Sequence, residues 1–391
     1  MNKIVIGMVG AGRATELHMH ALQRVSGIPL RFKTIVARRP EQLLPAKERY
    51  GFEIASYDFN DLLNDPEIDV IDICTPPYVH EDMVIRTIKA GKHVICEKPL
   101  SGYFGDEDDV DPIGLNVSKE VMYEKLLKSI ETLKSVIDTS DKKFMYAENF
   151  VYAPAVVKAA EIIGKKKNRI LYMKGEESLK GSSSPVAGEW SKTGGGTFIR
   201  TGSHPLSAIL WLKQQEAQAR GVEIYVESVL ADMGRVTPTL TEYEHRHIMA
   251  RPTDVEDNGT VILTFSDGSK AVIIATDVCL GGSKNYVELY CNDATINCTL
   301  TMNDLMETYF LDEDSLDDLY LSEMLPSKRG WNKPFIADEI IRGYTDEMQD
   351  FMEAIYYNRE PKSGFKLAYD TIKVTYAAYK SAEIGKRLWI N

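Results

Sequence analysis

Short hydrophobic runs alternate with segments of helical hydrophobic spacing along the first 100 residues. The run over 3–9 is almost unbroken, is too short for a helix and leads into glycines. This pattern is typical of a strand covered on both faces. We predict further strands over 31–37, 69–75 and 93–96, and helices over 16–25, 41–50 and 80–90. The alternation predicts right-handed crossovers and a doubly wound α/β parallel sheet.

Residues 102–118 interrupt this alternation with clustered acids, glycines and a proline. The ligand spacing of a calcium loop is absent, so we interpret the segment as an acidic surface insertion. A helix over 120–137 and a strand over 143–147 are predicted to follow. We therefore place a first, Rossmann-type domain at residues 1–150.

The second half of the chain has a different pattern, in which strand-like segments follow one another with short turns between several of them. We predict strands over 169–176, 222–230, 260–265, 271–279, 286–291 and 295–300. Ser266–Ser269 has the composition of a tight turn. The segments 338–357 and 367–388 return to helical spacing. Residues 151–391 are thus predicted to form an α+β domain with a mainly antiparallel open sheet and C-terminal helices.

Composition agrees with two globular domains, because 391 residues with 44% hydrophobic content can bury a large core. The formal net charge of −12 argues against nucleic acid and anionic membranes as partners. Five cysteines are sparse and form no CxxC pair, so we expect reduced thiols and no metal site. We find no signal-peptide pattern and no hydrophobic run of ~18 residues, which predicts a cytoplasmic protein with no membrane partner.

The first strand leads into the glycine-rich segment Gly7–Thr15. Paired glycines let the backbone turn sharply and approach a pyrophosphate at the start of the next helix. Thr15 occupies the third glycine position, where a small side chain normally permits close packing of helix on strand. The predicted contacts to NAD or NADP are Gly10, Gly12, Arg13 and Ala14.

The choice between the two cofactors stays open at the end of the second strand. No carboxylate is present in the segment 37–40 to bind the ribose hydroxyls of NAD. Arg38 or Arg39 can pair with the 2′-phosphate of NADP, or lie on the adenine face and serve NAD equally well. Surface arginines without a ligand are the third interpretation.

Two further segments follow predicted strands at the edge of the sheet where open α/β folds bind ligands. One is Thr75-Pro76-Pro77-Tyr78-Val79-His80, and the other ends in Glu97-Lys98-Pro99-Leu100. In the second half, Gly194-Gly195-Gly196 precedes Thr197–His204. With the early GAGRAT, these four motifs resemble the glucose-fructose oxidoreductase, inositol dehydrogenase and rhizopine catabolism (Gfo/Idh/MocA) family over essentially the whole chain.

The resemblance implies hydride transfer between a nicotinamide and a carbon that bears a hydroxyl group, on a sugar, cyclitol or glycoside. It assigns Lys98 to a place beside nicotinamide and substrate and His204 to the general acid/base. An imidazole that titrates near neutral pH and a lysine cation beside the same oxygen suit these roles. It also implies cofactor contacts for Thr75, Pro76 and His80, with Glu97 holding the loop under the cofactor.

The chain departs from many relatives four residues before His204, where Arg200 replaces an aspartate. An aspartate would orient the imidazole, whereas an arginine offers a fork to substrate oxygens. We therefore expect Arg200 to bind substrate, and we keep Lys98 and Tyr152 as alternative proton acceptors. Sugar sites favour aromatic faces and carboxylates, so Tyr152, Glu177 and Trp190 are further substrate-site candidates. Glu148, Asn149, Glu176 and Ser178 are further candidates at the same junction.

We interpret the chain as an NAD(P)-dependent dehydrogenase that forms a keto sugar from a carbohydrate substrate. An NAD-dependent glycosidase that uses transient oxidation and elimination needs the same site and is one alternative. A non-catalytic sugar sensor is the other, although the presence of both Lys98 and His204 argues against it. By analogy with the fold, an open sheet face predicts a homo-oligomer, either a dimer or a tetramer.

Overall fold

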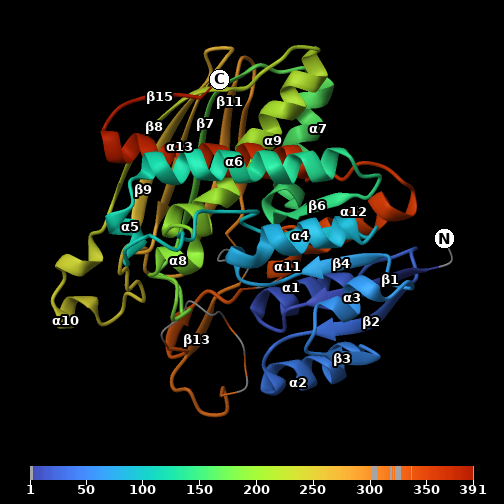
Figure 1. Ribbon diagram of the computed structural model, residues 1–391. Coiled ribbons are helices and arrows are strands. Elements are labelled where there is room, and N and C mark those ends of the chain that lie inside the picture. The colour runs from blue at the N-terminus through green and yellow to red at the C-terminus, as the bar shows by residue number, and fades with distance from the viewer. Residues whose placement is uncertain are drawn as a thin grey trace.

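The computed structural model describes residues 3–301, 306–317, 319, 321, 327–335 and 337–390. Two large sheets dominate the structure, and long helices lie between and beside them (Figure 1). Within the described segments, no helix has both the length and the apolar character needed to cross a membrane.

The first sheet is parallel throughout and has the strand order β3-β2-β1-β4-β5-β6. Its strands are β1 (Ile4–Val9), β2 (Leu30–Val36), β3 (Ile54–Ser56), β4 (Val70–Ile73), β5 (His93–Glu97) and β6 (Phe144–Ala147). This order is that of a Rossmann fold, which confirms the predicted doubly wound sheet. Our sequence analysis missed β3 and the short helix α3 (Asn60–Asn64) that follows it.

Both faces of this sheet are covered, which explains the unbroken hydrophobicity of its strands. On one face Ile4, Ile6 and Met8 pack in a cluster with residues of helices α1 (Arg13–Leu22), α2 (Pro40–Tyr50) and α12 (Tyr344–Tyr356). On the other face Val5 and Val9 pack with residues of α3 and of α4 (His80–Lys89). Helix α6 (Lys119–Asp138) contributes to both clusters.

The second sheet has seven strands in the order β12-β11-β7-β10-β9-β8-β15. Its strands are β7 (Ile170–Ser178), β8 (Val226–Gly234), β9 (Asn258–Phe265), β10 (Lys270–Thr276), β11 (Lys284–Cys291), β12 (Thr295–Thr299) and β15 (Leu388–Trp389). All neighbouring pairs are antiparallel except β7 and β10, so the prediction of a mainly antiparallel sheet is confirmed. The β9–β10 hairpin closes at the predicted turn, where Gly268 has a φ of +83°.

Helices α9 (Ser203–Arg220) and α13 (Phe365–Ile384) pack against one face of the second sheet. Buried and half-buried residues alternate along β10, so its opposite side is partly open. Sequence analysis missed α9 and α7 (Pro154–Lys166). Helix α9 is buried over most of its circumference, and this removes the one-sided spacing that identifies a surface helix.

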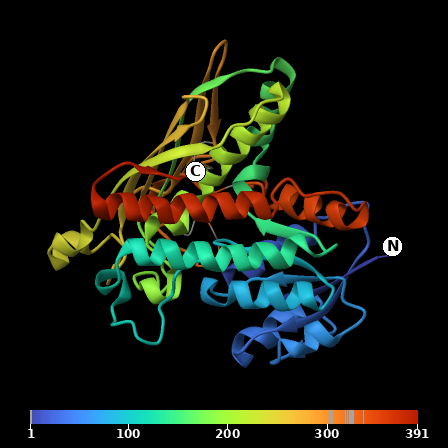
Figure 2. The ribbon, with the colours of Figure 1, turned by 45° about the horizontal axis from the view of Figure 1, so that its top comes forward.

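Helix α13 also lies alongside α6 of the first half, as Figure 2 shows. The C-terminal helices therefore contact both sheets. The predicted helix over 338–357 is wrong in one respect, since it breaks into α11 (Asp338–Ile341) and α12. Gly343 lies at the break with a φ of +96°, and a Cβ there would collide with the backbone of Asn149 and Tyr152.

The acidic segment 102–118 is only partly the surface loop that we predicted, because Tyr103 and Ile113 are buried in it.

The remaining elements are short. They are α5 (Ile113–Asn116), η2 (Asn149–Tyr152), α8 (Trp190–Thr193), α10 (Glu242–His245), the π-helical turn η3 (Phe198–Gly202), the 3-10 turns η1 (Pro77–Val79) and η4 (Thr237–Thr239), and the pair β13 (Thr308–Phe310) and β14 (Gly330–Asn332).

Candidate active site

The glycine loop after β1 has the shape that a dinucleotide needs. Gly10 has a φ of +115°, and a Cβ on it would collide with the carbonyl of Cys74. Gly12 is the N-cap of α1, no side chain caps this helix, and a Cβ on Gly12 would have no atom within 4 Å. Uncapped backbone N–H groups beside open space suit a pyrophosphate, so the residues present fit a dinucleotide.

The other predicted cofactor residues lie around this loop. Arg13 begins α1 and is paired with Glu16 at 2.7 Å. Arg38 is exposed just after β2. Thr75 and Pro76 follow β4, which is the neighbour of β1 in the sheet.

His80 braces two loops at the same sheet edge. It is fully buried, with Nδ1 at 2.8 Å from the carbonyl oxygen of Pro99 and Nε2 at 2.8 Å from that of Thr75. Burial lowers the pKa of this imidazole. Both ring nitrogens are engaged by backbone, so His80 holds the segment after β4 against the segment after β5.

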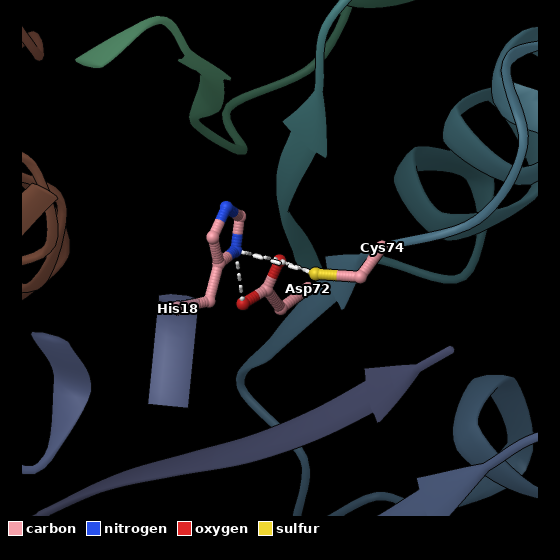
Figure 3. Close-up of side chains that lie close together, drawn as sticks. All are labelled: His18, Asp72 and Cys74. Carbon is pink, nitrogen blue, oxygen red and sulfur yellow. Dashed lines mark hydrogen bonds and ion pairs between the residues drawn. The ribbon is translucent and has the colours of Figure 1, made fainter. Parts of the chain in front are cut away.

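Behind Lys98 lies a buried polar cluster that sequence analysis missed (Figure 3). His18 of α1 has Nδ1 at 3.0 Å from both carboxylate oxygens of Asp72 and Nε2 at 3.2 Å from Oε1 of Glu97. Burial lowers the pKa of His18, but Asp72 and Cys74 together outweigh it, and the pKa is raised well above its ordinary value. The signal for this cluster was Asp72 itself, an acid within a buried hydrophobic strand.

The same cluster has a metal-like composition, because one ligand atom each of His18, Asp72 and Cys74 lies within 4.8 Å of the others. The hydrogen bonds explain the arrangement without an ion. Burial raises the pKa of Cys74 to about 12, so this group is a neutral thiol, and its Sγ lies 3.5 Å from Oδ1 of Asp72. An imidazolium between two carboxylates accounts for the geometry.

Glu97 connects the buried cluster to Lys98, because its carboxylate contacts both His18 and the backbone of Lys98. Its Oε2 accepts the backbone N–H of Lys98 at 2.8 Å. Burial raises the pKa of Glu97, but His18 and Lys98 together lower it further, so the net pKa is below its ordinary value. Lys98 then extends across to the second half of the chain, where its Nζ donates to the carbonyl oxygen of Arg200 at 2.5 Å.

The glycine run before His204 serves packing. A Cβ on Gly195 would collide with the hydroxyl of Tyr379, and one on Gly196 would collide with Glu256. This tight approach leads into the π-helical turn η3 and then into α9, whose second residue is His204. Single π-helical turns often occur at functional sites.

His204 is oriented by a carboxylate from a residue to which we gave no specific role. Its Nδ1 lies 2.6 Å from Oε1 of Glu148, which follows β6. The ring stacks on Phe150 with centroids 4.9 Å apart and planes at 22°. Within the described part of the chain, Nε2 forms no hydrogen bond, so this nitrogen is available to a ligand. Glu148 thus supplies the carboxylate that position 200 lacks.

The buried carboxyl group of Glu177 interacts electrostatically with both candidate catalytic residues, Lys98 and His204. Burial raises the pKa of its carboxyl group, and His204, Arg342 and Lys98 each partly oppose that rise. One buried oxygen of Glu177 and one of Glu148 have no hydrogen-bond partner among the described residues. The structure therefore brings Lys98, Glu177 and His204 to one polar site with unsatisfied acceptors.

Two further carboxylates border this site. Arg200 pairs with Asp277 just beyond the end of β10, and burial raises the pKa of Asp277 although Arg200 opposes it. Glu347 of α12 is buried with neither oxygen hydrogen-bonded within the described segments. Burial raises its pKa well above the ordinary value, and Glu97 and Glu148 add to the rise against the opposing effect of His18.

Two predicted substrate-site residues belong to the core instead. Tyr152 is fully buried, donates to Asp350 at 2.9 Å and accepts the backbone N–H of Ser363 at 3.0 Å. Trp190 is 2% exposed, and its indole donates to the carbonyl oxygen of Tyr103 at 3.1 Å. Their polar atoms are occupied by protein partners, which corrects both predictions and removes Tyr152 as an alternative base.

Comparison with known proteins adds an independent line of evidence. Residues 4–110 match a family model described as an oxidoreductase family with an NAD-binding Rossmann fold. Residues 170–297 match the model of the GFO/IDH/MocA C-terminal domain.

Individual relatives agree with these two matches. The chain is 24% identical to levoglucosan dehydrogenase of Pseudarthrobacter phenanthrenivorans over 417 residues, covering 100% of this chain and 98% of that protein. It is 37% identical to myo-inositol 2-dehydrogenase of Thermotoga maritima over 103 residues, which are 26% of this chain and 30% of that one. The crystal structure of GenD2 from gentamicin A biosynthesis in complex with NAD has a TM-score of 0.80 at 20% identity, covering 100% of this chain and 97% of that chain.

Proposed function

The chain belongs to the Gfo/Idh/MocA family of oxidoreductases with an NAD-binding Rossmann fold, and from that premise we propose that it oxidises a secondary hydroxyl group of a sugar, cyclitol or glycoside. The observation that carries the proposal is the His204–Glu148 pair, which faces the same polar site as Lys98 and Glu177. The names of the levoglucosan and myo-inositol dehydrogenases support a polyhydroxylated substrate.

Each residue has a role that its contacts support. Nε2 of His204 accepts the proton of the substrate hydroxyl, while Glu148 at Nδ1 fixes the ring and stabilises the imidazolium that forms. The ammonium of Lys98 stabilises the negative charge that develops on the same oxygen. When bound, the nicotinamide supplies the hydride acceptor. Glu177 accepts a hydrogen bond from a neighbouring hydroxyl group of the substrate.

The glycine loop and the segments after β4 and β5 hold the dinucleotide in this proposal. Gly10, Gly12 and the first turn of α1 bind the pyrophosphate, and Thr75, Pro76 and the loop of Glu97 lie under the nicotinamide half. We propose NAD as the cofactor, with Arg38 on the adenine face. Comparing kcat/KM with NAD and with NADP tests this choice, and a preference for NADP would assign Arg38 to the 2′-phosphate instead.

A screen of aldoses, polyols and glycosides for NADH formation tests the proposal. The variants Lys98→Ala and His204→Ala should each lower kcat by about 10²- to 10⁴-fold. Both should bind NADH as wild type does, measured by nicotinamide fluorescence. Lys89→Ala and His20→Ala replace the same residue types on the first domain and serve as controls. Net NADH formation excludes the glycosidase cycle, and full activity of either active-site variant would contradict its assigned role.

The domain limits and the assembly are part of the same proposal. We propose a substrate-binding domain from residue 151 onward and a homo-oligomer formed through the half-exposed face of the second sheet. Sedimentation at micromolar concentration should show a dimer or tetramer, and a monomer would refute the assembly.

A further inference from the structure

A hollow of about 490 Å³ lies where β7 and β10 end. Two loops, 180–188 and 246–252, form its walls, and the rest of the lining is Arg200, Val255, Glu256 and Asp277. Arg200 links the hollow to the site, because its carbonyl oxygen accepts the hydrogen bond from Nζ of Lys98.

The two loops are fixed against each other by close backbone contacts. The N–H of Met249 donates to the carbonyl oxygen of Lys180 at 2.7 Å, and that of Thr253 donates to Gly188 at 2.9 Å. A Cβ on Gly181 would collide with the backbone of Ala250. The hollow therefore has defined walls.

The lining is rich in cations. It includes Lys180, Arg200, Arg246 and Arg251. None of Lys180, Arg246 and Arg251 forms an ion pair with a carboxylate in the described part of the chain. Arg246 instead lies over the ring of Tyr243 at 3.7 Å, and Arg251 donates to the carbonyl oxygens of Ile248 and Ala250 at 2.7 and 2.8 Å.

The two carboxyl groups of the lining are already committed elsewhere. Asp277 pairs with Arg200. Glu256 accepts the N–H groups of Gly196 and Phe198 and the hydroxyl of Tyr379 at 2.8 to 2.9 Å, and burial raises its pKa to about 7. Lys180, Arg246 and Arg251 thus remain as cations without a carboxylate partner among the described residues, and in a protein with a net charge of −12 this local positive charge favours an anionic ligand.

We propose that this hollow binds an anionic substituent of the substrate, at a distance from the carbon that is oxidised. The inference rests on the proposed function and narrows its substrate class to acidic sugars or glycosides. Arginine forks bind carboxylate and phosphate groups with paired hydrogen bonds, and the hydroxyls of Ser182, Ser183 and Ser184 add donors at the rim. The volume suits a further sugar ring or a charged side group.

Binding to the full enzyme saturated with NADH tests the proposal by calorimetry. The probes are methyl glucoside, methyl glucuronide and methyl glucoside 6-phosphate, so that a carboxylate and a phosphate are compared with a neutral sugar. We expect at least one anion to bind about ten- to a hundredfold more tightly than methyl glucoside. The preference should fall with added salt, because the loops are exposed.

The double variant Lys180→Gln/Arg246→Gln should lose this preference. Arg169→Gln is the matched control, since Arg169 is exposed just before the opposite end of the same strand, β7, and the preference should persist in it. Equal binding of the three probes by wild type, or an anion preference that survives in the double variant, would overturn the anion site. Anion binding with no NADH formation on any sugar would refute the dehydrogenase proposal and leave the site intact.

Discussion

His18 and His204 both contact carboxylates, yet their surroundings differ in one decisive way. His18 is fully buried and both ring nitrogens face acids, Asp72 on one side and Glu97 on the other. His204 has Glu148 on Nδ1, whereas Nε2 forms no hydrogen bond within the described residues. The comparison teaches that a carboxylate partner alone does not make a histidine a base. A nitrogen left for the substrate is the second requirement.

Replacing each of the two histidines in turn is the strongest test of this difference between His18 and His204. His18→Gln leaves the buried Asp72 carboxylate and the partly buried Glu97 carboxylate without their cation, so we expect the free energy of unfolding to fall by about 3–5 kcal/mol. The free energy of unfolding of His204→Gln should fall by less, because His204 contacts one carboxylate, Glu148, where His18 contacts two. Urea unfolding of both variants measures the difference. Equal losses would show that the two histidines have the same structural role.

Glu148→Gln tests whether the carboxylate beside His204 contributes to catalysis. The amide keeps the size of the side chain but removes the negative charge at Nδ1 of His204, so kcat should fall by about 10²- to 10³-fold. The dissociation constant of NADH should stay unchanged, because Glu148 faces the histidine. A variant that loses NADH affinity and keeps kcat would place Glu148 in cofactor binding instead.

The pH dependence of stability should distinguish the buried histidine further. The pKa of His18 is raised well above its ordinary value of 6.5 in the folded protein, so the folded state binds the proton more tightly than the unfolded state. This contribution to stability is complete below pH 6.5 and is lost as pH rises toward the folded pKa. Wild type should thus lose stability above this pH with a steeper slope than His18→Gln. Parallel slopes would contradict the imidazolium assignment.

The smallest effect is expected from metal removal. Because His18, Asp72 and Cys74 satisfy one another by hydrogen bonds, a chelator should shift Tm by less than about 1 °C. Differential scanning calorimetry with and without EDTA measures this. A large drop in Tm, restored by zinc, would turn the cluster into a metal site.

Sequence alone predicted the elements whose hydrophobic pattern has one clear period. The strands of the first sheet other than β3, and helices α4 and α6, agree with prediction to within about two residues. Helix α9 was missed because nearly all of it is buried, and β3 because three residues carry no period. The break at Gly343 depends on the backbone of Asn149, far away in sequence.

The candidate site divides in the same way. Motifs identified Lys98 and His204, but no local pattern links Glu148 to His204 across 56 positions or His18 to Asp72 across 54. Tyr152 and Trp190 were misplaced because an aromatic residue near a site looks the same in sequence whether its polar atom faces the core or the cavity. Such pairings depend on tertiary contacts between residues that are far apart in the sequence.

Helices α12 and α13 make long-range contacts of this kind with the first half of the chain. They come from the last fifty residues, yet α12 packs on α1 and α13 packs on α6, both in the nucleotide-binding half. A truncated product ending at residue 150 would expose the hydrophobic sides of α1 and α6 to water. Such a fragment should be insoluble when expressed alone and should regain solubility when residues 151–391 are supplied as a separate polypeptide. The nucleotide-binding half would then depend on the last two long helices of the chain for its folding.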